Sequence, residues 1–150
     1  MIAVLQRVTK ASVSVEGAVV GKCQKGLAIL LGVADGDSEK DAKALAEKIC
    51  KLRIFTDEND KMNLSVMDID GEALVISNFT LLANYAHGNR PDYMSAAKPA
   101  EADRLYGLFC EELGGKLKSV EKGVFGADMA VEISNDGPVT IVMDSKILVK

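Results

Sequence analysis

Small polar groups follow an apolar run at residues 76–82, which read Ile-Ser-Asn-Phe-Thr-Leu-Leu. Ser77, Asn78 and Thr80 bring two hydroxyl groups and an amide to what we expect to be the end of a strand. Together with backbone N–H groups, such side chains can hold the oxyanion that develops when an ester carbonyl is attacked. The plainer interpretation is that they satisfy the end of a sheet through local backbone hydrogen bonds. This segment alone does not decide between the two.

A second candidate segment is residues 135–140, which read Asn-Asp-Gly-Pro-Val-Thr. Asp-Gly and Gly-Pro are turn dipeptides, and strand-like runs flank them, so we expect a hairpin with Gly137 and Pro138 at its tip. Gly137 has no Cβ, Pro138 has no N–H, and a peptide bond before proline is cis in about 5–6% of cases. A cis bond here would place two carbonyl oxygens side by side. An ordinary hairpin tip is the alternative interpretation.

Three other sets of polar residues have weaker functional interpretations. Arg7 lies on a predicted strand, where an arginine usually lays its stem on apolar neighbours and keeps its head in water. His87 lies in a polar loop without an identifiable orienting partner, so we expect a surface residue and not a general base. Lys116, Lys118 and Lys122 form either a solvated strand face or a local phosphate contact.

The length and composition bound the class of protein. The chain has 150 residues, 48% of them apolar, which suits one domain over residues 1–150 with a substantial core. No apolar stretch approaches the roughly 18 residues that span a bilayer. The first eight residues lack the pattern of a signal peptide. We therefore expect no membrane span and a cytoplasmic location.

The residue types give little support to metal or cofactor chemistry. Cys23, Cys50 and Cys110 are far apart and odd in number, which predicts packed thiols and neither a disulfide framework nor a zinc site. His87 is the only histidine, whereas a catalytic zinc site usually takes three protein ligands. We expect no metal and no cofactor. The net charge of −4 argues against a broad nucleic-acid footprint but leaves room for a small local patch.

The periodicity predicts an α+β fold with strand-rich ends around two helices. Residues 27–33 are nearly all apolar, which suits a strand covered on both faces, whereas residues 11–15 alternate. A helix is expected from Ser38 to about Leu52 and another from Pro99 to Gly114 and Gly115, with a polar loop over residues 86–98 between them. Strands are expected over residues 2–8, 11–15, 18–21, 26–33, 73–77, 116–121, 129–134, 139–143 and 146–149. These elements predict a three-layer β/β/α domain, with barrel-like, antiparallel-rich sheets and both main helices on one face.

The two candidate segments, at this separation in the chain, resemble the paired Ser-Gln-Phe-Thr and Gly-Pro-Val-Thr motifs of the D-aminoacyl-tRNA deacylases. The resemblance runs the length of the chain. It includes Gln-Arg-Val at 6–8, Leu-Arg-Ile-Phe at 52–55, Lys-Met-Asn-Leu at 61–64, Gly-Asn-Arg-Pro at 88–91 and Phe-Gly-Ala-Asp-Met at 125–129. Any one tetrapeptide could arise by chance, but their order and spacing together are specific.

The resemblance implies a homodimeric enzyme that hydrolyses the ester between a D-amino acid and the terminal adenosine of tRNA, and that also removes mischarged glycine. It implies that Gly137 and Pro138, joined by a cis bond, reach into the partner subunit's pocket. Their carbonyls would hold the substrate α-amino group and leave no space for an L side chain, so selectivity would be steric. Arg7 matches a position that braces this motif, and Met129 is assigned with it to substrate binding.

Ser77, Phe79 and Thr80 match the family's pocket for the ester carbonyl and the terminal adenosine, and we assign them, with Asn78, to catalysis. The family usually has Gln where this chain has Asn78, and Lys where it has His87. The chemical step implied is open: Thr80 could be the nucleophile, or a water or the adenosine 2′-OH could be set up by backbone groups. No base with a neutral pKa is evident near the motifs, which favours RNA-assisted attack of water with Thr80 in a positioning role.

Two other functions would fit part of the pattern. An esterase or amidase acting on another small substrate could use the same pocket. A non-catalytic RNA-binding or assembly module would bind a tRNA end without releasing an amino acid.

Overall fold

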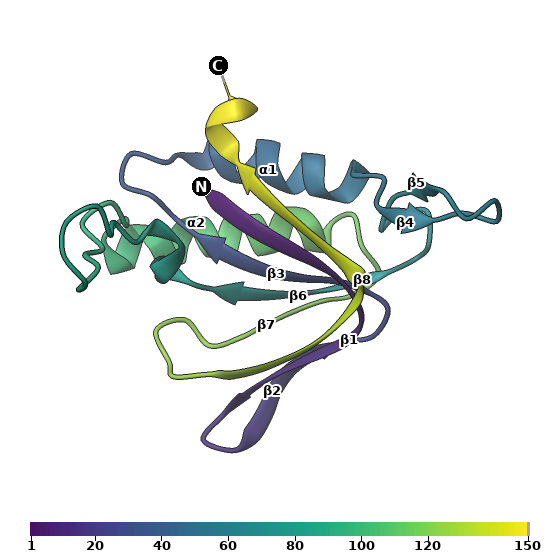
Figure 1. The fold of residues 1–150 in the computed structure, drawn as a ribbon, viewed down its shortest axis with the longest axis horizontal. Coiled ribbons are helices and arrows are strands. Elements are labelled where there is room, and N and C mark those ends of the chain that lie inside the picture. Colours follow the sequence, from purple (N-terminus) through teal and green to yellow (C-terminus); the bar gives the residue numbers. More distant parts are fainter. Residues whose placement is uncertain (150) are drawn as a thin grey trace.

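The computed structural model describes residues 1–149, and its centre is one mixed sheet of six strands (Figure 1). The strands run in the order β2-β1-β3-β6-β7, and β8 pairs with the other edge of β1. The pairs β3–β6 and β6–β7 are parallel, and the three pairs made by β1 are antiparallel. The bounds are β1 (Ile2–Val15), β2 (Ala18–Cys23), β3 (Gly26–Gly32), β6 (Glu72–Ser77), β7 (Val120–Lys122) and β8 (Ala130–Asp144).

The sheet curls until its two ends nearly meet, so the strands form an almost closed barrel. The Glu121 side chain, at the β7 end, accepts a hydrogen bond of 2.7 Å from the backbone N–H of Lys22 in β2. Gly21 also approaches β7 closely, because a Cβ built on it would lie 2.7 Å from the carbonyl oxygen of Lys122. The long strand β1 makes the curl possible, since its first half pairs with β3 and its second half with β2.

Alternating burial divides the interior into two cores. Leu27, Ile29 and Leu31 face the helices, and the intervening Ala28 faces the inside of the barrel. The strand β3 is therefore covered on both faces, as its near-continuous apolar sequence predicts. The barrel interior is completed by Val8, Ala11, Val13, Cys23, Leu74 and Ile76.

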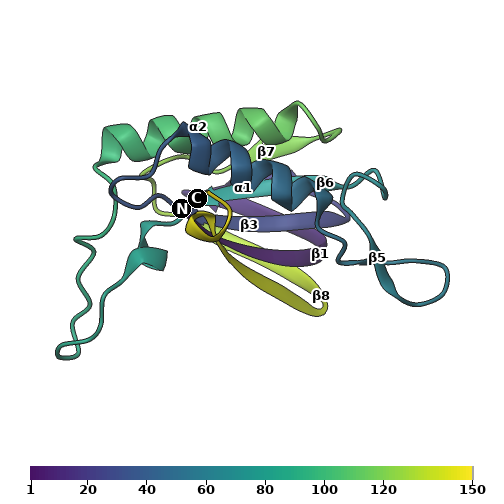
Figure 2. The same ribbon diagram turned by 90° about the horizontal axis from the view of Figure 1, so that it is seen from above.

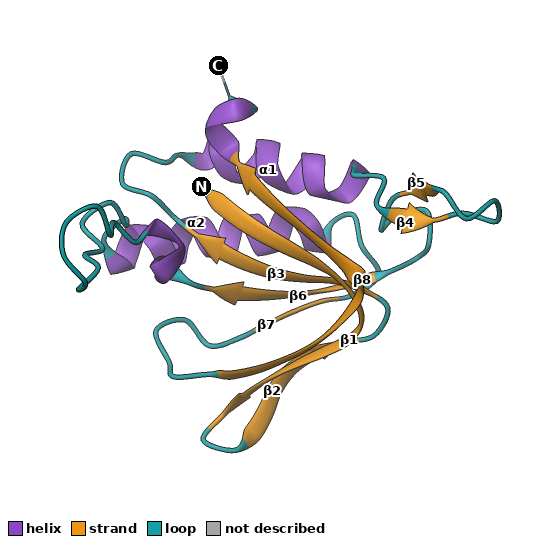
Figure 3. Cartoon of the chain, in the orientation of Figure 1, coloured by secondary structure: helices purple, strands orange, loops and turns teal. Residues whose placement is uncertain are grey.

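Two helices, α1 (Glu39–Lys51) and α2 (Pro99–Gly114), lie side by side over one face of the sheet (Figure 2). At the start of α1, Asp41 accepts hydrogen bonds from the backbone N–H and the hydroxyl of Ser38. The two helices are further joined where Arg104 pairs with Glu39 at 2.9 Å. The predicted α+β architecture, its helix bounds and its barrel-like sheets are confirmed (Figure 3).

Several strand predictions are wrong in detail. Residues 146–149 contain no strand, because the 3-10 helix η2 (Ser145–Ile147) begins directly after β8. Of residues 116–121, only the end enters β7, since Lys116 and Leu117 still donate backbone hydrogen bonds to Leu113 at the end of α2. A small sheet of β4 (Phe55–Thr56) and β5 (Met62–Leu64) was not predicted. No helix within residues 1–149 is long and apolar enough to cross a membrane.

The predicted hairpin at residues 129–143 is also wrong. Both arms belong to the single strand β8, which pairs with β1 along nearly its whole length. The segment that we expected to reverse the chain instead forms a bulge in the middle of a strand. Since β1 has 14 residues, it is long enough to pair with both arms in one direction.

Candidate functional site

The first half of the candidate site is built at the carboxyl end of β6. The backbone N–H of Asn78 donates to the carbonyl of Leu31 at 2.8 Å, which fixes the chain just before the 3-10 helix η1 (Phe79–Leu82). Gly32, at the end of β3, allows this helix to approach closely. A Cβ on Gly32 would lie 2.8 Å from Leu82 and 3.1 Å from the Asn78 carbonyl oxygen. A buried strand end therefore presents an ordered, exposed turn.

This turn displays donors and hydroxyl groups suited to an ester carbonyl. The Thr80 hydroxyl donates a short hydrogen bond to the side-chain oxygen of Asn78. Within residues 1–149, the backbone N–H groups of Phe79 and Thr80 have no acceptor, as is usual for the first residues of a helical turn. Two free N–H groups can stabilise a developing oxyanion. An amide oxygen is not a base, so the Asn78 contact orients the Thr80 hydroxyl without activating it.

Met129 belongs spatially to this first half. A Cβ on Gly123 would lie 2.5 Å from the Met129 sulfur and 3.4 Å from Ile76, so the three residues are in contact at the end of β6. Gly123 is held there by its N–H, which donates to the carbonyl of Val75 at 3.1 Å. We grouped Met129 with Gly137 in the sequence, but the structure brings it beside the residue that precedes Ser77.

A buried tyrosine supports the same strand end. The Tyr106 hydroxyl, on α2, donates to the carbonyl of Val75 at 2.8 Å and its ring packs near Phe125. Burial raises the pKa of Tyr106 far above its ordinary value, so the hydroxyl stays protonated and acts as a structural donor. On the exposed side, the rings of Phe79 and Tyr93 make an edge-to-face contact with centroids 5.0 Å apart.

The second half of the site is the bulge in β8. Gln6 pairs with Thr140 and Val8 with Asn135, so four residues (136–139) lie opposite the single residue Arg7. The Gly137–Pro138 peptide bond is cis, as the resemblance led us to expect, and both residues are exposed.

Asn135 closes the base of this bulge. Its side-chain oxygen accepts from the backbone N–H of Val139 at 2.9 Å, and its amide donates to Gln6 at 2.7 Å. The bulge is therefore held to β1 by the Asn135 side chain as well as by the backbone pairing of the two strands.

Arg7 holds the bulge against a distant segment. Arg7 is only 9% exposed. Its Nε donates to the carbonyl of Asp136 and its Nη1 to the carbonyl of Ile54, both at 2.9 Å. A longer contact of 3.4 Å joins Nη1 to the Thr56 hydroxyl. A Cβ on Gly137, which has φ of +137°, would lie 2.9 Å from Val139 and 3.2 Å from the Arg7 guanidinium. Arg7 is thus a buried brace, and the solvated-edge interpretation is wrong.

The two halves lie far apart within one chain. Asn78 is level with Leu31, which pairs with Ala3, whereas the bulge lies opposite Arg7. The offset of four residues along β1 corresponds to about 13 Å. In addition, β3 and β1 separate β6 from β8, which adds roughly 14 Å across the sheet. Residues 77–80 and Gly137–Pro138 of one chain therefore do not line a common pocket.

Sequence reasoning missed the residues that hold the site in place. Asn135, Ile54, Thr56 and Tyr93 all contact predicted site residues, but none of them was assigned a role in the site from the sequence. Only Asn135 had a local signal, because an asparagine often begins a turn by accepting a nearby backbone N–H. The Ile54 contact comes from a backbone carbonyl that lies 47 positions away in the chain, which no local pattern reveals.

The remaining candidates lie outside both halves. Lys116 and Lys118 of the lysine cluster pair with Glu112 and Asp70. His87 is exposed, and the three cysteines are free and buried, with burial raising the pKa of Cys23 to about 11. Residues 1–149 contain no group of three or more His, Cys, Asp or Glu side chains that could hold a metal ion.

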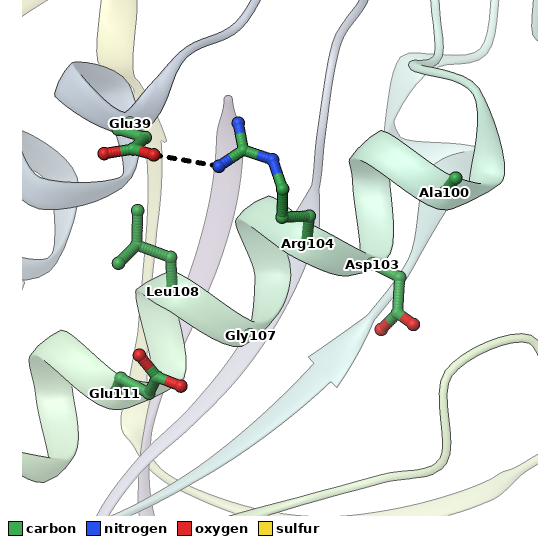
Figure 4. A pocket seen from close by; sticks show the side chains of 7 residues that line it. All are labelled: Glu39, Ala100, Asp103, Arg104, Gly107, Leu108 and Glu111. Carbon is green, nitrogen blue, oxygen red and sulfur yellow. Dashed lines mark hydrogen bonds and ion pairs between the residues drawn. The ribbon is translucent and has the colours of Figure 1, made fainter.

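A shallow pocket of about 440 Å³ lies on the outer side of α2 (Figure 4). Its charged lining residues are acidic apart from Arg104, which points to Glu39 and is also paired with Glu101. Hydrogen bonding to Arg104 lowers the pKa of Glu39, so this carboxylate stays charged at neutral pH. None of the predicted site residues lines the pocket, and its negative charge would repel a nucleic acid.

The chain is similar to known proteins over nearly its whole length. Residues 4–144 match the model of the family described as D-Tyr-tRNA(Tyr) deacylase. The D-aminoacyl-tRNA deacylases of Caldicellulosiruptor saccharolyticus and a Sulfurihydrogenibium species are each 58% identical over 97% of this chain and over 98% and 99% of their own lengths.

Two solved structures share the fold. One, described as a c-Myc DNA unwinding element binding protein, is 41% identical with a TM-score of 0.91, covering 96% of this chain and 98% of its own. A probable eukaryotic D-amino acid tRNA deacylase has a TM-score of 0.80 at 15% identity, covering 95% and 97% of the two chains. The chain belongs to the D-aminoacyl-tRNA deacylase family, whose members are hydrolases of the aminoacyl-tRNA ester bond.

Proposed function

We propose that this enzyme works as a homodimer in which the Gly137–Pro138 bulge of one subunit completes the pocket at residues 77–80 of the other. The separation of these two segments within one chain is the observation that carries the proposal. Each half is exposed and rigidly held, yet neither forms an enclosed site alone. A symmetric dimer would create two equivalent complete sites, because a two-fold axis pairs each half with its complement.

The bulge supplies the selectivity in this proposal. Two exposed carbonyl groups accept hydrogen bonds from the substrate α-ammonium group, and the backbone then occupies the space that an L side chain would need. Arg7 and Asn135 support this role because they leave the bulge little freedom to move aside. Glycine has no side chain, so steric rejection does not exclude it, and mischarged glycyl-tRNA is a second substrate. We place this proofreading in the cytoplasm, where aminoacyl-tRNA is used.

The other half performs the chemistry. The free N–H groups of Phe79 and Thr80 hold the ester carbonyl oxygen, and the exposed Phe79 ring contacts the terminal adenosine. Thr80 donates to Asn78, so its oxygen lone pairs remain available to accept a hydrogen bond from an attacking water. Water attacks the ester carbonyl carbon, the bond to the ribose oxygen breaks, and the free amino acid and tRNA are released. The adenosine 2′-OH assists in place of a protein base.

Complementation between two inactive variants tests the shared site. Thr80→Arg places a bulky cation in the first half, and Gly137→Val crowds Val139 and Arg7 in the second. Each variant alone should lose deacylation of D-aminoacyl-tRNA. Coexpressed at equal levels, they should recover about one quarter of wild-type specific activity, because half of the dimers are mixed and each mixed dimer has one intact site.

Sedimentation of each variant controls for folding and assembly. A mixture no more active than its components, with dimers of the mixed composition present, would contradict the cross-subunit site. Deacylation by a strictly monomeric wild-type protein would contradict it independently.

A further inference from the structure

The exposed aromatic side chains of residues 1–149 are gathered within the candidate site and directly after it. Phe79 is 58% exposed and Tyr85 is 79% exposed, and Met94, which follows in the same segment of the chain, is 86% exposed. The other aromatic residues outside this region, Phe55, Tyr106, Phe109 and Phe125, are buried or half-buried. Leaving large aromatic side chains in water is unfavourable in a chain that buries or half-buries its other aromatic residues, so this concentration points to a ligand.

Tyr85 and Met94 lie on an ordered hairpin, residues 84–95, which we call the aromatic hairpin. Asn84 and Asp92 exchange two backbone hydrogen bonds of 2.9 Å across it. Its returning arm is fixed to the loop that follows β3, where the N–H of Asp35 donates to the carbonyl of Ser95 at 2.9 Å. The hairpin projects from the body of the domain between η1 and α2 (Figure 2). Tyr93 connects it to the site through its edge-to-face contact with Phe79.

The charge of this region favours a polyanion. Residues 84–98 contain Arg90 and Lys98 against one carboxylate, Asp92, in a chain whose net charge is −4. Asp92 accepts the backbone N–H of Met94 at 3.1 Å, and Arg90 is exposed with no acidic partner among residues 1–149. Exposed flat side chains interleaved with a free cation are what proteins present to single-stranded nucleic acid.

We propose that the aromatic hairpin is a stacking platform for the unpaired 3′-terminal nucleotides that precede the terminal adenosine of the tRNA. This inference rests on the proposed function, because the adenosine at Phe79 sets where the strand leaves the pocket. From there, the contact between Phe79 and Tyr93 leads to the hairpin that carries Tyr85 and Met94. Bases stack on these side chains, and Arg90 pairs with a backbone phosphate. The competing occupant is a second copy of the chain.

Two substrates distinguish an effect on nucleotide binding at the hairpin from an effect on the chemical step. One is D-aminoacyl-tRNA, and the other is the same D-amino acid esterified to adenosine alone, which lacks the preceding nucleotides. Tyr85→Ala and Met94→Ala should each raise KM for the tRNA substrate by about 5- to 150-fold, the range for one lost base stack, with kcat unchanged. Neither variant should change the kinetics with the adenosine ester. Val19→Ala, which truncates an exposed apolar residue on β2, is the matched control and should behave as wild type.

The charged contact has its own readout. Arg90→Gln should reduce the slope of log KM against log salt by about 0.7, the value for one phosphate contact with a single strand. Lys48→Gln, on the exposed side of α1, should leave that slope unchanged.

The possible results distinguish failure of the stacking platform from failure of the proposed deacylase function. Equal effects of Tyr85→Ala on both substrates, or none on either, would overturn the platform. Dissociation of the Tyr85→Ala and Met94→Ala variants into monomers, at concentrations where wild type is dimeric, would overturn it in favour of a subunit interface. Wild-type protein inactive on both D-substrates would overturn the proposed function itself.

Discussion

Replacing Arg7 by lysine should loosen the Gly137–Pro138 bulge while keeping the positive charge. Arg7 joins two segments, because Nε donates to the carbonyl of Asp136 and Nη1 to that of Ile54. An ammonium on a shorter stem cannot reproduce this fork, so at least one of the two hydrogen bonds is lost. A hydrogen bond from a charged group contributes about 1.5–3 kcal/mol, and at 9% exposure water does not readily replace it. The midpoint of thermal unfolding should fall by about 3–12 °C.

Thermal unfolding and initial rates with matched D- and L-aminoacyl-tRNA check this prediction. Deacylation of the D-substrate should fall, and hydrolysis of the L-substrate should become measurable as the bulge gains freedom. Thr56→Val is the matched control, because it removes only the 3.4 Å contact and should cost at most about 1 kcal/mol. If Arg7→Lys retained wild-type stability and discrimination between D- and L-substrates, Arg7 would not be the brace.

Three further substitutions test other parts of the structure. Asn78→Gln should preserve kcat/KM for D-aminoacyl-tRNA or raise it by up to about tenfold, and L-aminoacyl-tRNA should still not be hydrolysed. Loss of activity, or hydrolysis of L-substrates, would show that the pocket is adapted to asparagine at this position. Thr80→Ala should retain measurable deacylation, and complete loss in a folded protein would favour a threonine nucleophile. Burial raises the pKa of Asp41, but hydrogen bonds from Ser145 and Ser38 outweigh it and lower the pKa below its ordinary 3.8. Chemical denaturation should therefore show Asp41→Asn to be less stable than wild type by about 1.5–3 kcal/mol at pH 7. This difference in stability is complete above pH 3.8 and shrinks as the pH falls further. A difference that stayed constant down to about pH 2 would contradict the reasoning.

The helices and the buried strand were predictable because their signals are local. Ser38 and Asp41 begin α1 through contacts three residues apart, and the continuous apolar run of β3 follows from cover on both faces. The hairpin prediction failed for the opposite reason. Asp-Gly-Pro favours a reversal locally, but pairing of both arms with the long strand β1 overrides that preference and turns the reversal into a bulge.

The site shows the same division between local and long-range information. Residues 77–80 form one turn, so their joint role could be predicted from adjacent sequence. The grouping of Met129 with Gly137 was drawn from the resemblance, and it separates in the structure because the chain crosses the barrel between them along β8.

The Arg7 brace depends on a carbonyl that only the folded β4 region supplies. Within one subunit, the residue that holds the bulge and the turn that carries the hydroxyl groups are stabilised by different parts of the sheet. A substitution can therefore weaken selectivity at Arg7 without disturbing the donors at Phe79 and Thr80, and this independence makes separate assays for D- and L-substrates informative.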